Sequence, residues 1–198
     1  LEAGVLHVVA TPIGNLGDIT RRAADVLENV EIIAAEDTRR TQSLLSALGL
    51  PRPKMVALHE HNETAASEGV ISALLGGATV ALVSDAGTPL ISDPGYGLLN
   101  AALEKGLPVR SVPGPCAAIA ALSISGLATD QFAFSGFLNA KSTVKRRELE
   151  ALCRDKRTLI FYESPHRMLD TLEILGDVFG HQRRIVVARE LTKRFETL

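Results

Sequence analysis

The chain has 198 residues, of which 46% are hydrophobic and 22% are charged. This composition is typical of a folded globular protein and excludes an intrinsically disordered chain. No apolar run reaches the length of a membrane span, and residues 1–10 lack the basic start and cleavage site of a signal peptide. Two cysteines, Cys116 and Cys153, are too few for a disulfide framework and match no zinc-binding spacing. We therefore expect a cytoplasmic protein.

Charge is distributed unevenly along the chain, although the formal net charge is only −2. Residues 1–130 hold 8 Lys and Arg against 14 Asp and Glu, a balance of −6. Residues 131–198 hold 13 against 9, a balance of +4. This asymmetry favours the second half as the part that would hold a polyanion, but a surface that only meets solvent explains it equally well.

Short hydrophobic runs alternate with turn residues over the first part of the chain. The runs predict strands at 5–10, 31–35, 55–58, 80–84 and 109–112. Helices are predicted between them at 18–29, 41–48, 63–75 and 94–105. We expect Asp18, Asn62 and Asp93-Pro94 to open three of these helices and Gly106 to end the last one. The repeated strand–loop–helix order predicts a parallel sheet covered on both faces.

Pro113-Gly114-Pro115 is the strongest boundary signal in the sequence. We place an N-terminal α/β domain at 1–115 and a C-terminal α/β domain at 116–198. The second domain is predicted to contain helices at 116–125 and 143–152, a helix opened by Ser164-Pro165, and strands at 132–134, 158–162 and 185–188. The chain starts without Met and ends without a terminal helix, so we expect the second domain to be incomplete at residue 198.

The most informative stretch is VALVSDAGTPLISDPGYG, residues 80–97. An apolar run that suits a buried strand leads into a long loop of Gly, Pro and small polar residues, and ligands of open α/β sheets bind beyond such strand ends. The similar loops TPIGN, EDTR and PGPCA follow other predicted strands. None of them is a Walker A or GxGxxG loop, and their prolines lack the N–H groups that a phosphate needs. The loops therefore favour an uncharged or cationic ligand, such as adenosine joined to an amino acid.

Two groups of reactive side chains have a simpler and a sharper interpretation. His59 and His61, with Glu60 and Glu63, form either a polar loop or a metal site, and the polar loop is the simpler interpretation. Cys116 is either a nucleophile or a small residue that packs against a ligand or helix, and packing is the stronger interpretation. The residues 164–167 are explained as a helix cap and first turn, but they also suit an RNA phosphate.

Seven motifs follow one another along the chain: TPIGNLGDIT, AAEDTR, LVSDAGTPLISDPG, PGPCAAIAALS, GFLNAK, TLIFYESPHR and VVARELTK. Together they resemble the ribosomal RNA small-subunit methyltransferase I family, a branch of the tetrapyrrole methylase superfamily. The resemblance covers essentially all 198 residues. The chain departs from it at Asn139, where the family's GFLPAK motif has proline.

The resemblance implies two α/β domains of the tetrapyrrole methylase type, the first with a mostly parallel sheet and the second with a mixed sheet, and a cofactor cleft between them. It also implies a homodimer, without membrane or metal, that uses S-adenosylmethionine to methylate the ribose 2′-hydroxyl of a cytidine in the decoding region of 16S rRNA. The implied cofactor contacts are Pro12, Asp85, Ala86, Gly87, Thr88, Ile91, Cys116, Ala117, Tyr162, Glu163 and Leu191.

The sequence does not decide which group would activate the ribose hydroxyl. Glu163, Asp37 and Lys141 are the catalytic candidates, Glu36 and Asp85 are further acids at strand ends, and alignment alone is an alternative. Phosphate contacts are expected from Lys141, Lys145, Arg146, Arg147 and Arg167. Two other functions remain: a precorrin-like small-molecule methylase, in which the basic second half has no purpose, and a non-catalytic RNA-binding relative, which would not bind S-adenosylmethionine.

Overall fold

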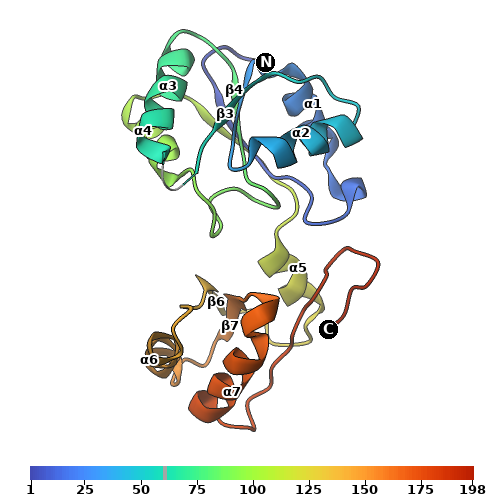
Figure 1. Ribbon diagram of the computed structural model, residues 1–198, viewed down its shortest axis with the longest axis vertical. Coiled ribbons are helices and arrows are strands. Elements are labelled where there is room, and N and C mark those ends of the chain that lie inside the picture. Colours follow the sequence, from blue (N-terminus) through green and yellow to red (C-terminus); the bar gives the residue numbers. More distant parts are fainter. Residues whose placement is uncertain (60–61) are drawn as a thin grey trace. The chain divides into compact units, whose positions relative to one another are not determined.

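The computed structural model describes residues 1–59 and 62–198 (Figure 1). The chain divides into two compact units, a first unit from Leu1 to Ala117 and a second unit from Ala118 to Leu198. The sequence-based boundary, between residues 115 and 116, lies two residues earlier and stays a prediction. Within the described part of the chain, none of the helices has the length and hydropathy that crossing a bilayer requires.

The first unit is built on one parallel sheet. In its described part the strands are β1 (Leu6–Val9), β2 (Ile32–Ala35), β3 (Lys54–Ala57), β4 (Val80–Val83) and β5 (Val109–Val112). They pair in the order β3-β2-β4-β1-β5, and every pairing is parallel. The predicted parallel sheet is confirmed, and its strands all end at the same edge.

Helices cover both faces of this sheet. They are η1 (Leu16–Asp18), α1 (Arg21–Asn29), α2 (Thr38–Ala47), α3 (Glu63–Leu75) and α4 (Tyr96–Glu104). Successive strand residues point to opposite faces, so Leu82 packs with Leu98 of α4 while Val83 packs with Leu27 of α1. Figure 1 shows α1 and α2 on one side of the strands and α3 and α4 on the other. Burial of apolar side chains on both faces stabilises this layered arrangement.

Three helix starts of the first unit differ from the prediction. The helix predicted from residue 41 begins at Thr38, because Asp37 caps it by accepting from the N–H of Arg39. The sequence predicts Asp18 as the cap of the first helix, but Asp18 lies in η1 and Thr20 caps α1, accepting a 3.0 Å hydrogen bond from the N–H of Ala23. The sequence also predicts that Asp93-Pro94 opens the helix before residue 106. Instead α4 begins at Tyr96, because Gly95 has a φ of 117° and breaks the helical path.

Asn62 hydrogen-bonds back to the end of β3 and to His59. Its Oδ1 accepts a hydrogen bond from the N–H of His59, and its Nδ2 donates to the carbonyl of Ala57, both at 2.9 Å. The following helix begins at the predicted residue, but Asn62 makes no side-chain capping bond to the described residues of α3, since both ends of its amide bind the backbone of Ala57 and His59. Glu60 and His61 of the alternative metal cluster lie outside the described residues.

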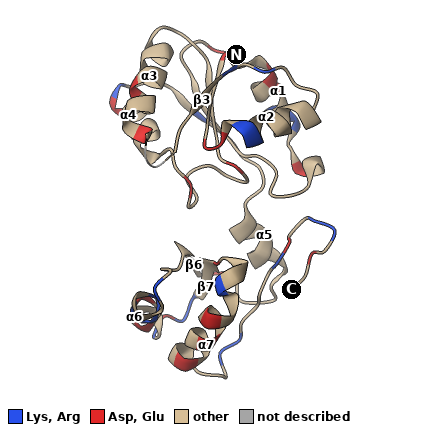
Figure 2. Ribbon diagram, in the orientation of Figure 1, with Lys and Arg blue, Asp and Glu red and all other residues tan. Residues whose placement is uncertain are grey.

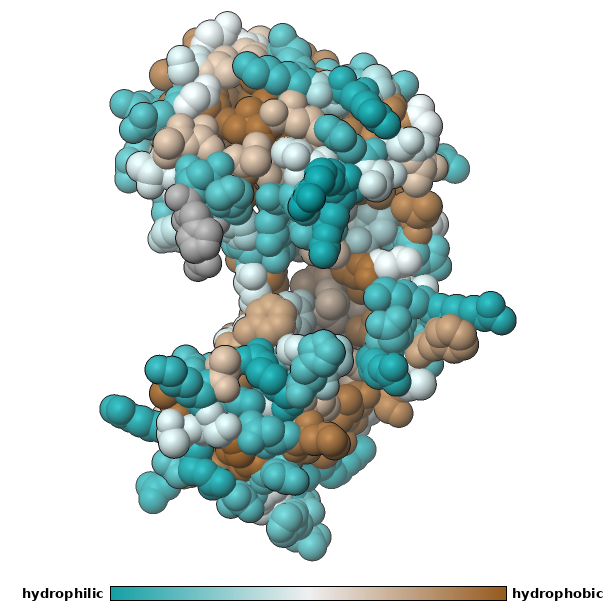
Figure 3. Space-filling view, in the orientation of Figure 1, coloured by the Kyte–Doolittle hydropathy of each residue, from teal (hydrophilic) through white to brown (hydrophobic). Residues whose placement is uncertain are grey.

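The second unit is smaller. Its described elements are α5 (Ala117–Ile124, which starts in the first unit), β6 (Phe132–Phe137), α6 (Ser142–Leu152), β7 (Thr158–Tyr162), η2 (Pro165–Arg167) and α7 (Met168–Phe179). Leu138, Leu149 and Ile174 form the buried centre between α6, α7 and the strand pair. Two strands and two helices bury few apolar side chains. Leu169 and Phe137 accordingly stay 79% and 58% exposed, and Figure 3 shows hydrophobic groups at the surface of this unit.

The sheet of the second unit corrects one expectation. β6 and β7 pair in parallel, with an irregularity between Phe134 and Phe137, so the described strands form a parallel pair and not the expected mixed sheet. Residues 185–188, predicted as a further strand, join no described ladder, and the nearest pairing is an isolated bridge between Arg189 and Thr197. The β-branched residues favour extended backbone there, but extended backbone becomes a strand only beside a hydrogen-bonding neighbour.

Candidate functional site

The loops at the carboxyl edge of the first sheet are joined to one another. Thr11 follows β1 and Gly87 follows β4, and each donates its N–H to the other's carbonyl, at 2.9 and 3.0 Å. Thr88 Oγ1 donates to the carbonyl of Pro115, beyond β5, at 3.0 Å. Three loops that are far apart in sequence are therefore held as one surface, at the place where open α/β sheets bind ligands.

The loop after β4 adopts a backbone that few residues tolerate. Gly87 has a φ of 86°, and a Cβ atom at this position would lie 3.2 Å from Cγ2 of Ile13. Leu90 and Ser92, which are not glycines, also have positive φ values of 73° and 68°. Such strained residues persist only where the surroundings hold them, and they gather at ligand sites.

Carboxylates are concentrated beside this loop. The N–H of Asp37 donates to Asp85 Oδ1 at 3.0 Å, and the N–H of Asp85 donates to Glu36 Oε2 at 3.3 Å. Arg40 Nη1 lies 3.0 Å from Asp85 Oδ2. Asp37 also caps α2, accepting from the N–H of Arg39 at 2.9 Å, and this hydrogen-bonded Arg39 side chain lowers the pKa of Asp37. Asp37 is therefore an ionised cap and is poorly suited to take up a proton.

Asp93 differs from its acidic neighbours. Burial raises the pKa of Asp93 most, the nearby charges of Glu36 and Asp85 add to this, and a hydrogen bond with Ser84 opposes it, so that the pKa is about 6. The sequence interpretation assigned Asp93 to a helix cap, but its side chain faces Ser84 and these two acids. A half-buried carboxyl with this pKa exchanges a proton near neutral pH, as the exposed carboxyls of proteins do not.

Thr11 carries a second unusual group. Its residue is 1% exposed, and its Oγ1 has no hydrogen-bond partner among the described residues. A buried hydroxyl without a partner is rare because its desolvation is not repaid by a bond. The hydroxyl therefore suits a ligand that offers a donor or an acceptor at the end of β1.

The structure gathers most of the predicted cofactor contacts at this edge. Pro12 follows β1, and Cys116 and Ala117 follow β5. The contacts that follow β4 are Asp85, Ala86, Gly87, Thr88 and Ile91. Pro12 is buried, Ile91 is exposed, and Cys116 is a half-buried free thiol. The other three, Tyr162, Glu163 and Leu191, belong to the second unit. Their roles as cofactor contacts stay predictions.

A buried ion network occupies the end of β7 in the second unit. Lys145 is 0% exposed, and its Nζ donates to Thr171 Oγ1 at 2.6 Å and to Asp170 Oδ2 at 3.1 Å. Glu163 Oε2 lies 3.4 Å from the same ammonium and accepts from Thr171 Oγ1 at 2.7 Å. A phosphate could reach Lys145 only by displacing these partners, so we remove it from the predicted RNA contacts.

Glu163 is held from several sides. Its side chain is 4% exposed, and Oε1 accepts from the N–H of Ser164 and pairs with Arg167 Nη2, both at 2.6 Å. Burial raises the pKa of Glu163, but the hydrogen bonds from Thr171, Ser164 and Lys145 and the charge of Arg167 outweigh it and lower the pKa overall. Glu163 is thus an ionised carboxylate that joins several partners at the turn between β7 and η2, and it is poorly suited to accept a proton.

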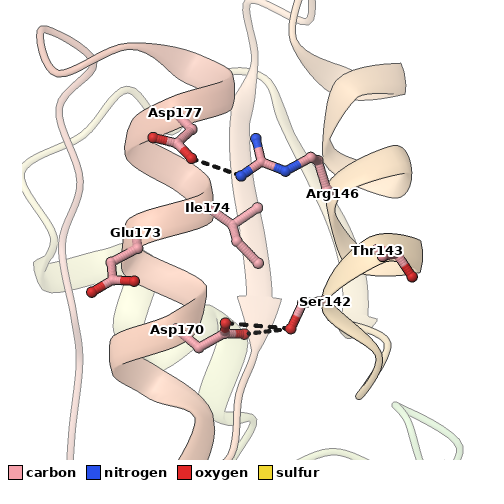
Figure 4. A pocket seen from close by; sticks show the side chains of 7 residues that line it. All are labelled: Ser142, Thr143, Arg146, Asp170, Glu173, Ile174 and Asp177. Atoms are coloured by element: carbon pink, nitrogen blue, oxygen red, sulfur yellow. Dashed lines mark hydrogen bonds and ion pairs between the residues drawn. The ribbon is translucent and has the colours of Figure 1, made fainter.

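The remaining predicted RNA contacts are unequal. Arg146 Nη2 pairs with Asp177 Oδ2 at 2.6 Å across a groove between α6 and α7, where Figure 4 shows the two side chains pointing toward one another. Arg167 is held by Glu163. Lys141 and Arg147 are exposed, and no ion pair among the described residues engages them. Only these last two are free to meet a phosphate without losing a protein partner.

The hydrogen bonds of Asn139 give a reason why this chain has asparagine where the family motif has proline. Its Oδ1 accepts from the N–H of Lys141 at 2.9 Å, and its own N–H donates to Glu148 Oε2 at 3.2 Å. Proline has no N–H and could not make the second bond. The asparagine therefore ties the residue that precedes α6 to a later turn of the same helix.

Tyr162 connects β7 to the start of α5. Its hydroxyl accepts a hydrogen bond from the N–H of Ala118 at 3.2 Å. Its ring packs edge-on against Phe134 and Phe137, with centroids 4.9 and 5.4 Å away. These contacts fix the carboxyl end of β7, where the resemblance expects cofactor contacts.

Comparison with known proteins identifies the family. Residues 5–198 match the family described as Tetrapyrrole (Corrin/Porphyrin) Methylases. The chain is 56% identical over 195 residues to the ribosomal RNA small subunit methyltransferase I of Xylella fastidiosa (strain 9a5c), covering 98% of this chain and 71% of that protein. The chain belongs to the ribosomal RNA small subunit methyltransferase I family. The family member from Pseudomonas aeruginosa is 54% identical over 198 residues, covering 100% of this chain and 70% of that protein.

A solved structure supports the fold assignment. The cobalt precorrin-4 methyltransferase CbiF matches with a TM-score of 0.68 and 16% identity, over 98% of this chain and 83% of that protein. At this identity the likeness shows the fold alone. It confirms the predicted tetrapyrrole methylase fold class.

The sequence analysis did not identify Thr11 or Asp93 as site residues, and it did not predict that Lys145 is buried. For Lys145 a signal existed, because Lys145, Leu149 and Leu152 follow the i, i+4, i+7 spacing of one helix face. No local signal in the sequence marks Thr11 or Asp93. The Thr11 hydroxyl has no hydrogen-bond partner among the described residues, and the pKa of Asp93 is raised, because residues distant in sequence bury both side chains.

Replacing Asp93 by Asn should reveal its raised pKa. The folded state keeps this proton to a higher pH than the unfolded state does, so the stability it brings is present below about pH 4 and is lost as pH rises through about 6. The free energy of unfolding of Asp93→Asn minus that of wild type should therefore grow by about 1–2 kcal/mol between about pH 4 and 7.5. Urea titrations measure it, with Asp25→Asn on α1 as control. A difference that stays flat with pH would contradict the assignment.

Replacing Lys145 by Met should destabilise the second unit. The change leaves Glu163 and Asp170 without their shared ammonium, and breaking a buried ion pair in this way lowers the free energy of unfolding by about 3–5 kcal/mol. Urea denaturation is the measurement. Lys141→Met, on the same chain segment but exposed, should change it by less than about 0.5 kcal/mol. Equal effects of the two substitutions would show that the network does not hold this unit together.

Proposed function

We propose that the chain transfers the methyl group of S-adenosylmethionine to the ribose 2′-hydroxyl of a cytidine in the decoding region of 16S rRNA. Membership of the ribosomal RNA small subunit methyltransferase I family carries this proposal, together with the joined loops at the carboxyl edge of the first sheet. The cytidine and its position follow from the family resemblance. The homodimer that the same resemblance implies stays a prediction.

The first unit fits S-adenosylmethionine better than it fits a nucleoside triphosphate. The donor carries a positive sulfonium and an ammonium, and the edge of the sheet holds the acids Glu36, Asp85 and Asp93. The same acids would repel a triphosphate. Thr11 offers a buried hydroxyl without a described partner, and Gly87 lets the backbone approach a ligand closely. We propose that Thr11 joins Gly87 and the other predicted contacts around the cofactor.

When bound, S-adenosylmethionine supplies a methyl group on a positively charged sulfur that leaves readily. The task of the protein is then mainly to align the ribose oxygen with the methyl carbon, on the side opposite the sulfur, and such alignment can supply several kcal/mol of the barrier. Glu163 and Asp37 both have lowered pKa values and are held by cations. We propose that they position their loops and do not accept the hydroxyl proton, which instead passes to solvent water as the O–C bond forms and the S–C bond breaks.

The RNA must present a single 2′-hydroxyl to the donor. A nucleotide inside a helix cannot reach a protein pocket, so we propose that the target is unstacked or lies in a loop. The exposed cations Lys141 and Arg147 stand at the start and on the outer side of α6. We propose that they meet phosphates of the splayed strand.

The direct test is binding followed by transfer. Calorimetry measures the affinity of the protein for S-adenosylmethionine, and tritiated methyl transfer is then measured on small ribosomal subunits that lack the modification. Nuclease digestion and mass spectrometry should yield 2′-O-methylcytidine. Binding without transfer to rRNA, but with methylation of a tetrapyrrole, would favour the small-molecule alternative. Absence of binding would contradict the proposal and favour the non-catalytic alternative.

Asp37→Asn separates capping from proton transfer. Asparagine caps helices as well as aspartate does, so α2 should be preserved while the negative charge is lost. We expect the single-turnover rate of methyl transfer to stay within about twofold of wild type, because Asp37 is proposed to position the loop only. Loss of a general base would instead slow the reaction about 10²–10⁴-fold. A drop of that size with unchanged affinity for S-adenosylmethionine would make Asp37 the base.

A further inference from the structure

Two segments of the second unit carry a group of cations outside every predicted site. We call this group the basic surface, and its members are Arg154, Lys156, Arg157, Arg183 and Arg184. The first three lie between α6 and β7, and the last two follow α7. Figure 2 shows Lys and Arg along the segment that runs from the end of α7 to the C-terminus.

Arg183 fixes the two segments side by side. Its Nη1 donates to the carbonyl of Asp155 at 2.9 Å, and its Nη2 donates to the carbonyl of Arg157 at 3.1 Å. Its guanidinium also lies 4.9 Å from the ring centroid of Phe179, at the end of α7. Arg183 therefore holds the backbone of the two segments that carry these cations close together.

Three members of the basic surface are available to a ligand. Arg154, Lys156 and Arg184 are exposed, and no ion pair among the described residues engages them, although Arg184 Nη2 donates to the carbonyl of Gly126 at 3.4 Å. Asp155 is the acid of these two segments, and it is occupied by Arg157, whose Nη2 lies 2.6 Å from Asp155 Oδ2. The hydrogen bond from Arg157 lowers the pKa of Asp155 to about 2, so this pair stays ionised and neutral as a unit. An excess of exposed positive charge remains.

This availability distinguishes the basic surface from three of the five contacts that the sequence predicts, whereas Lys141 and Arg147 share it. Lys145 is buried, and Arg146 and Arg167 are paired with Asp177 and Glu163. Exposed cations without an acidic partner bind phosphate without first breaking a salt bridge. The structure thus adds the exposed cations of the two segments beside α6 to Lys141 and Arg147, the predicted contacts that no described ion pair engages.

We propose that the basic surface binds the sugar–phosphate backbone of the rRNA substrate at a point remote from the reacting nucleotide. It lies at the amino end of β7, whereas Tyr162 and Glu163 lie at the carboxyl end, about 15 Å away along five strand residues. Because it reads phosphates, it adds affinity and orientation without base specificity. The inference rests on the proposed function, since it takes rRNA as the substrate.

The triple substitution Arg154→Gln, Lys156→Gln and Arg184→Gln tests the basic surface and leaves the structural Arg157 and Arg183 in place. Binding to 16S rRNA is measured between about 50 and 200 mM salt. Each lost phosphate contact should reduce the slope of log affinity against log salt by about 0.7–0.9, hence by about 2–3 in total. The affinity at 50 mM salt should fall at least tenfold, equally for 16S rRNA and for an unrelated RNA.

The matched control removes three exposed cations from the first unit, as Arg52→Gln, Lys54→Gln and Lys105→Gln. It changes the net charge by the same amount and should leave the salt slope at the wild-type value. If the basic-surface triple keeps the wild-type slope, or if the control loses as much slope, the inference is wrong. Should the triple variant unfold, the single substitutions Arg154→Gln and Arg184→Gln should each reduce the slope by about 0.7–0.9.

Failure of this inference is distinguishable from failure of the proposed function. Calorimetry with S-adenosylmethionine and methyl transfer to small subunits are measured on the wild type and on both triple variants. If the wild type transfers no methyl group to small subunits, the proposed function is contradicted. Normal wild-type transfer, with an unchanged salt slope in the basic-surface variant, would overturn this inference alone.

Discussion

The uniform direction of the strands in the first sheet is the constraint on which the proposed site depends. Because β1, β2, β4 and β5 all end at one edge, loops separated by up to about a hundred residues of sequence come together there. Backbone hydrogen bonds between Thr11 and Gly87, and the bond from Thr88 to Pro115, then lock these loops to one another. The Gly- and Pro-rich composition follows from this geometry, since the loops turn sharply and approach closely.

Electrostatics at this edge follow from the same packing. Glu36, Asp85 and Asp93 are brought together by strands that are neighbours in the sheet but not in the sequence. Part of their negative charge is balanced by Arg40, and part is relieved by the raised pKa of Asp93. A cationic ligand would complete this balance, and a polyphosphate would oppose it. The acids therefore fit a sulfonium donor.

The second unit has a buried charged centre beside its small apolar cluster. Lys145 replaces an apolar residue on the inner face of α6 and joins Glu163, Asp170 and Thr171. Through Glu163 this centre also holds Arg167 and the turn after β7. A small unit with few buried apolar side chains gains a defined turn from such a network, provided that every partner is satisfied.

Sequence alone predicted the elements whose signals are local. β7 at 158–162 and α3 at 63–75 match the prediction, because continuous apolar runs and flanking turn residues mark their ends. The sequence analysis mispredicted where two helices begin, after the caps Thr20 and Gly95, because these starts depend on backbone dihedrals. It also mispredicted a strand at 185–188, because a strand needs a neighbouring strand to pair with. The predicted contacts after β1, β4 and β5 fall at one edge, as the parallel order requires. The pKa of Asp93 and the buried hydroxyl of Thr11 arise only in the folded chain.

Hydrogen–deuterium exchange with and without S-adenosylmethionine tests the central claim most directly. The account places the donor against the joined loops of the first sheet. It therefore predicts slower exchange at residues 11–15, 84–93 and 113–117 when the donor is bound, with little change in α1 and α3. Calorimetric binding that leaves exchange in all three loops unaltered would contradict the account, because the donor would then occupy some other surface.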